Sequence, residues 1–158
     1  MLIEERLAEL GLVLPEPMAA TGLALPFPWV RLWSHRAYVS GHGPLLPDGT
    51  LWPARGKVGA DLTEEEAYAA ARATGLAMLA SLRRTIGDLD RVSAWLRVFG
   101  MVNTSPGFNR TPAVINGFSD LIIELWGPEA GAHARSAIGV AELPLNLPVE
   151  IEAELAFH

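Results

Sequence analysis

Arg135 is the residue whose surroundings best suit the binding of a small anion. It lies in a predicted strand over residues 134–141, where its same-face neighbours at 137, 139 and 141 are alanine, glycine and alanine. A long cation beside three small residues leaves a concavity, and a guanidinium binds a carboxylate through two parallel hydrogen bonds. The alternative is a structural ion pair of Arg135 with Glu152 or Glu154 on the next strand. The residues alone leave both interpretations open.

Ser40 and His42 form a second pair with chemical potential. The run Ser40-Gly41-His42-Gly43 places a hydroxyl near an imidazole, but alternate residues share a face only in a regular strand. The ordinary interpretation is a glycine-rich strand end with a solvent-facing histidine. The other three histidines are expected in a turn, in a loop and at the terminus, and carry no site prediction: His35, His133 and His158.

The first half of the chain contains the elements that must position Ser40 and His42. Residues 3–10 predict a short amphipathic helix, and a proline-rich connector follows over residues 15–28. Residues 29–43 predict a β-hairpin that turns near residue 35. Thr63 and Glu66 have capping-box spacing, so a helix is expected from Thr63 to about residue 86. Its stripe of small residues is the kind of face that packs closely on a sheet.

The second half contains the elements that must position Arg135. Hydrophobic patterning predicts a strand over residues 92–102, a helix from Pro112 to Gly127, and strands over residues 134–141 and 149–157. The order β-β-α-β-α-β-β predicts an α+β domain with one sheet and two helices on a single face. A hairpin around the loop 142–148 would place Arg135 opposite about residue 155, with Glu150 several pairs away.

Composition excludes several classes of protein. Half of the 158 residues are hydrophobic and 19% are charged, which favours burial of apolar surface against another chain. With 18 acidic and 12 basic residues the net charge is -6, and no basic stripe exists, so nucleic acid is disfavoured as a partner. The sequence has no cysteine and therefore no thiolate chemistry. No apolar run approaches the roughly 20 residues of a membrane span, so we expect a cytoplasmic protein without a membrane partner.

The segment around Arg135 resembles the RidA family of reactive-intermediate deaminases, also called the YjgF or UK114-like family and once labelled endoribonuclease L-PSP. The resemblance covers about residues 28–157 and defines a RidA-like domain over residues 28–158. Residues 1–27, the short helix and connector, lie outside it and indicate a divergent subgroup. The matching residues are Ala134-Arg135-Ser136, Val140-Ala141, Leu143-Pro144 and Val149-Glu150-Ile151-Glu152-Ala153, with Tyr38-Val39-Ser40-Gly41 and Val98-Phe99 upstream.

This resemblance implies a chorismate-mutase-like fold and a homotrimer, with sheets around a central barrel and clefts between subunits. It also implies hydrolysis of small enamines and 2-imino acids to 2-keto acids and ammonia, without a metal or a cofactor. Arg135 would bind the substrate carboxylate, the Ala137 N–H would bond the group at the reacting carbon, and Glu150 would position or activate water. Ser40 and Asn116 would line the pocket.

Two residues depart from the family pattern. Ala137 stands where many deaminases have cysteine, and Trp29 stands near the position where active members often carry a tyrosine. These departures motivate a second hypothesis, a non-catalytic trimeric protein that binds small metabolite carboxylates such as 2-keto acids. A third hypothesis, RNA cleavage, follows from the older family label alone. If the protein hydrolyses imines, a bulge at Gly139 or a neighbouring subunit would bring Glu150 to Arg135.

Overall fold

A computed structural model describes residues 2–19 and 24–158. The expected connector over residues 15–28 therefore lies partly outside the described residues. Short 3₁₀ turns occupy Leu89–Arg91 and Pro144–Asn146. The helices and strands are α1 (Ile3–Glu9), β1 (Val30–Trp33), β2 (Arg36–His42), α2 (Glu64–Ile86), β3 (Val92–Asn103), α3 (Thr111–Ala130), β4 (Ala134–Val140) and β5 (Val149–Phe157).

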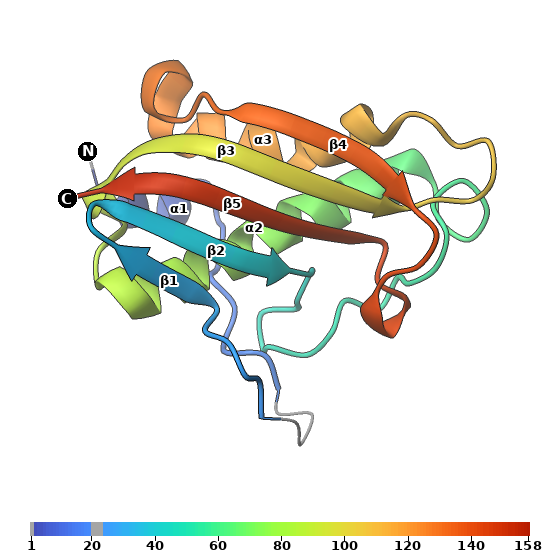
Figure 1. Cartoon of the computed structure of the whole chain (residues 1–158), viewed down its shortest axis with the longest axis horizontal. Coiled ribbons are helices and arrows are strands. Elements are labelled where there is room, and N and C mark those ends of the chain that lie inside the picture. The colour runs from blue at the N-terminus through green and yellow to red at the C-terminus, as the bar shows by residue number, and fades with distance from the viewer. Residues whose placement is uncertain (1, 20–23) are drawn as a thin grey trace.

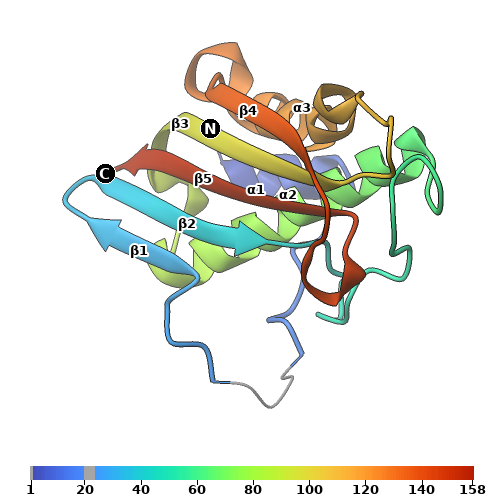
Figure 2. The same ribbon diagram turned by 45° about the vertical axis from the view of Figure 1, so that its right-hand side comes forward.

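The five strands form one mixed sheet in the order β1-β2-β5-β3-β4. β5 lies in the centre, antiparallel to β2 and β3, and β4 runs parallel to β3 at one edge. The helices lie on one face of this sheet and leave the other face open (Figure 1, Figure 2). The predicted α+β class and element order are confirmed.

The expected hairpin between the last two strands is wrong. β3 and β4 are joined through α3, and a crossover of this kind makes its two strands parallel. The chain then passes from β4 to the centre of the sheet, where β5 pairs with β2 and β3. The pairing of β3 with β4 runs from Arg97 to Asn103 without a shift, so there is no bulge at Gly139.

α2 begins with the predicted capping box, in which Thr63 and Glu66 exchange side-chain to backbone hydrogen bonds. Its small-residue stripe meets α3 at Gly75 and Ala71, and α2 also contacts β2 and β5 of the sheet. A Cβ at Gly75 would lie 2.7 Å from Cδ2 of Leu121, and a Cβ at Gly117 would lie 2.1 Å from the carbonyl oxygen of Tyr68. Glycine at both crossing points lets the two helices approach closely.

β3 departs from the strict alternation that its sequence suggests. Strict alternation would place Trp95 on the face opposite Val92 and Val98, yet all three are buried, with Trp95 only 1% exposed. Pairing with β5 shifts between Val92 and Ala94 and again between Trp95 and Arg97. Each irregularity turns the following side chains to the other face, so Trp95 joins the core beside Phe118 and Trp126.

α3 and α1 complete the helical layer. α3 carries Pro112 in its first turn, and Gly127, at φ 80°, breaks the helix where the sequence predicts its end. α1 packs into the same core through Ile3 and Leu7, and Glu4 lies 3.6 Å from Arg83 of α2. None of the helices in the described residues is long and apolar enough to cross a membrane.

Candidate functional site

Arg135 projects from β4 toward α3. Its guanidinium donates to Oδ1 of Asn116 at 2.8 Å, to Oγ of Ser119 at 3.0 Å and to the carbonyl of Pro112 at 3.4 Å. All three acceptors are neutral, and burial lowers the pKa of Arg135. Of the ion pairs in the described ranges, none involves Arg135, so the expected alternative of a pair with Glu152 or Glu154 is wrong. The arrangement fixes the guanidinium through neutral hydrogen-bond partners, and the nearby negative charge of Asp120 opposes the lowering of its pKa.

Ser119 connects Arg135 to His133. The Nδ1 atom of His133 contacts the carbonyl of Gly131 at 2.7 Å, and Nε2 contacts Oγ of Ser119 at 2.9 Å. Because a carbonyl only accepts, Nδ1 carries the proton and Nε2 accepts from the serine hydroxyl. Burial lowers the pKa of His133 and favours this neutral form. The serine oxygen is thereby oriented to accept from Arg135.

Ala137 lies two residues beyond Arg135 on the same face of β4. It is half-buried against the core, and its carbonyl accepts from the Thr111 hydroxyl at 3.0 Å. β4 is an edge strand, and within the described residues it pairs with β3 alone. Alternate backbone groups along its outer edge therefore have no strand partner in the single chain.

Glu150 is the second residue of β5, away from the group around Arg135. Its side chain lies against Gly41, where a Cβ would come within 2.6 Å of Oε2 of Glu150. Burial, followed by the negative charge of Glu152, raises the pKa of Glu150. A raised pKa makes the carboxylate form of Glu150 a stronger base toward a water molecule.

Arg135 and Glu150 do not meet within one chain. Arg135 pairs with Val98 and shares its buried, helix-covered face, whereas Glu150 pairs with Met101 and projects to the open face. β3 also lies between their strands, so strand geometry places their Cα atoms about 14 Å apart. Of the two routes expected from the sequence, the bulge at Gly139 is absent. A cleft containing both groups therefore needs a second subunit.

The remaining predicted site residues gather near Glu150, except Asn116. Trp29 and Glu150 both line a cavity of about 310 Å³ at the end of β2 and the start of β5. Ser40 lies next to Gly41 on the same strand, but its hydroxyl donates to the carbonyl of Pro28 at 2.8 Å. Asn116 belongs to the Arg135 group through its 2.8 Å hydrogen bond.

His42 is not the solvent-facing residue expected from the sequence. It is 6% exposed, because pairing of β2 with β5 shifts between Val39 and His42 and turns the imidazole inward. Nε2 contacts Oγ of Ser81 at 2.8 Å, and the ring packs on Trp29 with centroids 5.0 Å apart. Burial lowers the pKa of His42 to about 4, so it is neutral at physiological pH.

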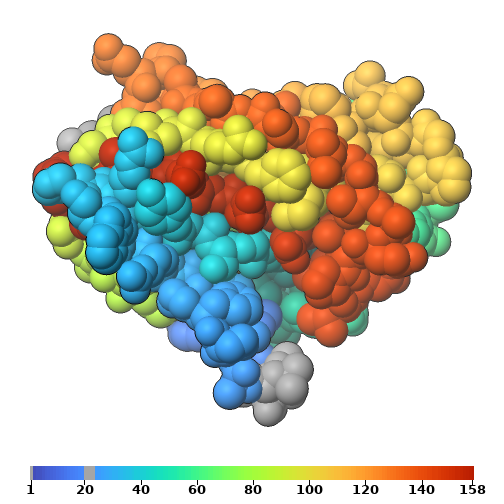
Figure 3. Space-filling model, in the orientation of Figure 1, coloured from blue at the N-terminus to red at the C-terminus, as the bar shows by residue number. Residues whose placement is uncertain are grey.

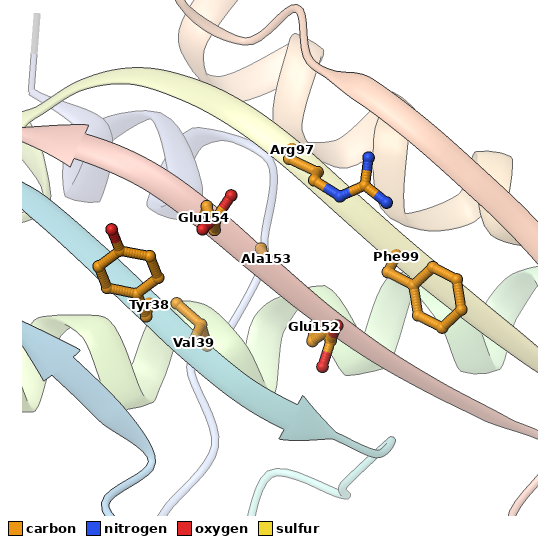
Figure 4. A pocket seen from close by; sticks show the side chains of 7 residues that line it. All are labelled: Tyr38, Val39, Arg97, Phe99, Glu152, Ala153 and Glu154. Carbon is orange, nitrogen blue, oxygen red and sulfur yellow. The ribbon is translucent and has the colours of Figure 1, made fainter.

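A second hollow, of about 270 Å³, lies on the open face of the sheet. Tyr38, Phe99, Arg97 and two glutamates project into it from β2, β3 and β5 (Figure 4). No helix of the described residues lies on this face, and its side chains are visible across the front of the molecule (Figure 3). Aromatic and charged groups of both signs thus lie side by side on a surface that one chain leaves uncovered.

Sequence patterns did not identify the residues that hold these groups in place. His133 and Ser119 are fourteen residues apart, and nothing in their spacing signals the contact. The same is true of buried Asn103, which takes a hydrogen bond from Lys57 at 2.8 Å and donates to the carbonyl of Leu147 at 3.2 Å. Within the described ranges, no cluster of three or more His, Asp or Glu residues could hold a metal ion.

A mixed five-stranded sheet with its helices on one face is the architecture of a chorismate-mutase-like domain. A family model described as "YjgF/chorismate_mutase-like, putative endoribonuclease" matches residues 4–153. The chain therefore belongs to the YjgF family, which is also called the RidA family.

Individual relatives agree with this assignment. The chain is 38% identical over 151 residues to protein TCP17 of Trypanosoma cruzi, covering 96% of this chain and 91% of the relative. A crystal structure of a protein of unknown function from Agrobacterium tumefaciens is 34% identical, with a TM-score of 0.87, covering 99% of this chain and 92% of that one. A "putative endoribonuclease" from Shewanella oneidensis is 32% identical, with a TM-score of 0.89, covering 99% and 100%.

Proposed function

We propose that the protein hydrolyses small, reactive 2-imino acids and their enamine tautomers to 2-keto acids and ammonia. The observation that carries this proposal is Arg135, a guanidinium fixed by neutral acceptors within a motif shared with imine-hydrolysing members of the family. Such an arginine offers its charge and its remaining N–H donors to a substrate carboxylate. We place the reaction in the cytoplasm.

The reaction needs orientation, a water molecule and proton transfers. Water adds across the C=N bond of the imine, and the resulting carbinolamine loses ammonia to leave the keto acid. Arg135 binds the substrate carboxylate. The backbone N–H of Ala137 donates a hydrogen bond to the group on the reacting carbon. Glu150 accepts a proton from the attacking water and delivers it to the imine nitrogen, which gives the carbinolamine. It then transfers the carbinolamine hydroxyl proton to the amino group, which leaves as ammonia as the carbonyl forms, and its raised pKa favours both transfers.

We propose that this cleft forms between subunits of a homotrimer. Arg135 and Glu150 are on opposite faces of the sheet in one chain, while β4 presents an unpaired outer edge. A neighbouring chain placed along that edge brings its own Glu150, Ser40 and Trp29 toward Arg135. Neither a metal nor a cofactor is required for the hydrolysis of an already electrophilic imine.

The second candidate function is binding of small carboxylates without catalysis. Ala137 supplies no thiol and Trp29 no hydroxyl, while the arginine site stays intact. RNA cleavage is a weaker candidate: the family description and the name of the Shewanella relative raise it, but a net charge of -6 opposes binding to a phosphate backbone.

The test is the release of keto acid from 2-iminopropanoate and 2-iminobutanoate, generated in the assay by an amino-acid oxidase. We expect the wild-type protein to exceed the uncatalysed rate. Arg135→Ala should lose at least about tenfold in kcat/KM, because it removes a charged hydrogen bond to the substrate carboxylate. Arg83→Ala, at an exposed position of α2, is the control. Saturable 2-keto-acid binding with no turnover would favour the binding protein, and equal background rates without binding would reject both. A ribonuclease assay on the same sample tests the third candidate.

A further inference from the structure

A cavity of about 310 Å³ lies where β2 ends and β5 begins. The segment before β1, the loops at residues 44–52 and 144–147, and α2 enclose it. Its walls are mainly apolar, with aromatic and leucine side chains from separate parts of the chain: Phe27, Trp29, Leu45, Leu51, Leu145 and Leu147. The volume and the apolar lining are typical of a site for one small molecule.

One cation lines this cavity. Arg84 of α2 donates to Oγ of Ser81 at 3.2 Å, and Ser81 contacts Nε2 of His42 at 2.8 Å. Nδ1 of His42 contacts the carbonyl of Ser40 at 2.6 Å and so carries the proton. Nε2 therefore accepts from the Ser81 hydroxyl, and the Ser81 oxygen accepts from Arg84. The buried neutral histidine holds the serine, and the serine holds the arginine.

The same sequence of contacts holds Arg135. Arg135 donates to Oγ of Ser119, and Ser119 donates to Nε2 of His133. Nδ1 of His133 donates to the carbonyl of Gly131, two residues earlier. In His42 the carbonyl is also that of the residue two positions earlier. The molecule thus builds one arginine-serine-histidine-carbonyl arrangement twice, once at the proposed carboxylate site and once at the cavity.

The positive charge of Arg84 is available to a ligand. Among the described residues it takes part in none of the ion pairs, whereas the adjacent Arg83 lies 3.6 Å from Glu4. Burial lowers the pKa of Arg84, and the nearby negative charge of Glu16 opposes this shift without forming an ion pair. Glu150 also lines the cavity and adds a negative charge that disfavours ligands with a second anionic group.

We propose that this cavity binds monocarboxylates that carry a branched aliphatic or aromatic body, with the carboxylate on Arg84 and the body against the apolar wall. A guanidinium fork matches one carboxylate, and the leucine and aromatic side chains remove the body of the ligand from water. This carboxylate position at Arg84 is distinct from the proposed one at Arg135, although Trp29 and Glu150 border both sites.

The experiment is calorimetric titration of the full-length protein with 4-methylpentanoate and 3-phenylpropanoate, compared with acetate and with 4-methylpentanamide. We expect saturable binding of the two long acids, and binding at least about tenfold weaker for acetate and for the uncharged amide. Arg84→Met should weaken binding of the long acids by about tenfold or more, while Arg83→Met, the neighbouring arginine on the same helix, should match the wild type. Unchanged thermal melting of both variants would show that the fold is intact.

Arg135→Ala separates the cavity from the proposed reaction site, because it should lower kcat/KM for imine hydrolysis at least about tenfold and leave binding of the long acids intact. Conversely, Arg84→Met should keep the wild-type rate on 2-iminopropanoate. Absence of long-acid binding to the wild type, equal binding by Arg84→Met, or loss of binding in Arg135→Ala would each overturn the cavity proposal. None of these results would bear on whether Arg135 supports imine hydrolysis.

Discussion

At the scale of residues, the molecule fixes two of its arginines, Arg84 and Arg135, with neutral partners. A carboxylate next to Arg135 would cancel its charge, but a serine oxygen oriented by a neutral histidine positions the guanidinium and leaves the charge available. The motif around Arg135 is readable in the sequence, whereas Ser119 and His133 become its partners only through the packing of α3 against β4. The proposed roles of Ser40, Trp29, Asn116, Ala137 and Glu150 remain predictions.

Glu150 gives a prediction about pH. Its pKa is raised by burial and then by the charge of Glu152, and the proposed reaction needs its carboxylate form. The rate should therefore fall as pH drops through this raised pKa. Glu152→Gln removes the neighbouring charge and lowers the pKa of Glu150, so the acid limb of the kcat/KM profile should move to lower pH. Glu154→Gln, farther along β5, is the control and should move it less.

The raised pKa of Glu150 also predicts how the free energy of unfolding depends on pH. A carboxyl whose pKa is raised in the folded state binds its proton more tightly there than in the unfolded chain. Its stabilising contribution is present below the ordinary glutamate pKa and is lost as pH rises through the folded value. Glu152→Gln should therefore stabilise the protein at neutral pH relative to acidic pH, as measured by urea unfolding. An acid limb and a stability profile both unmoved by Glu152→Gln would contradict this account of Glu150.

At the scale of elements, the crossing of α2 and α3 depends on two glycines of unequal tolerance. A Cβ at Gly117 would meet the backbone oxygen of Tyr68 at 2.1 Å, whereas a Cβ at Gly75 would meet a methyl group of Leu121 at 2.7 Å. The backbone of Tyr68 cannot move away from an added Cβ, whereas the side chain of Leu121 can rotate away from one. Gly117→Ala should therefore destabilise the protein by about 1–3 kcal/mol, while Gly75→Ala should stay within about 1 kcal/mol of wild type because helix propensity offsets the contact. Equal unfolding free energies for the two variants would contradict this packing.

The order and boundaries of the elements were predictable, but strand pairing was not. Caps, glycines and alternation define each element locally, as the capping box at Thr63 and the break at Gly127 show. Alternation along β5 shows which side chains share a face, but carries no information about which strands lie beside it. The bulges that bury Trp95 and His42 are likewise set by neighbouring strands. For this reason the sequence identified Arg135 and Glu150 and misjudged how they are related in space.

At the scale of the whole molecule, the open face of the sheet is the surface that neighbouring chains would cover in the proposed trimer. Half of the residues are hydrophobic and 19% are charged, and one sheet face has no helix to cover it. Tyr38 on this face is 37% exposed. In the proposed trimer, the three open faces would surround a central barrel, and β4 would border the neighbouring subunit. One assembly would then account for both the uncovered face and the separation of Arg135 from Glu150.

This assembly predicts that one charge on the open face will dissociate the protein. Phe99 projects from β3 into the hollow that Glu152 and Glu154 also line. In a trimer, Phe99→Glu would add a carboxylate from each chain to a barrel that already holds these glutamates, and unpaired like charges in a confined space are strongly unfavourable. Light scattering should therefore give three chains of 17.0 kDa for the wild type and a lower mass for Phe99→Glu.

The matched control is Ile123→Glu, which places the same charge on an exposed apolar residue of α3, on the helical side of the molecule. It should keep the trimeric mass, because helices lie on the outside of the proposed barrel. Imine hydrolysis should fall with the trimer in Phe99→Glu and persist in Ile123→Glu, since dissociation separates Arg135 from the neighbouring Glu150. A monomeric wild-type protein that still turned over imines would contradict both the trimer and the cleft shared between its subunits.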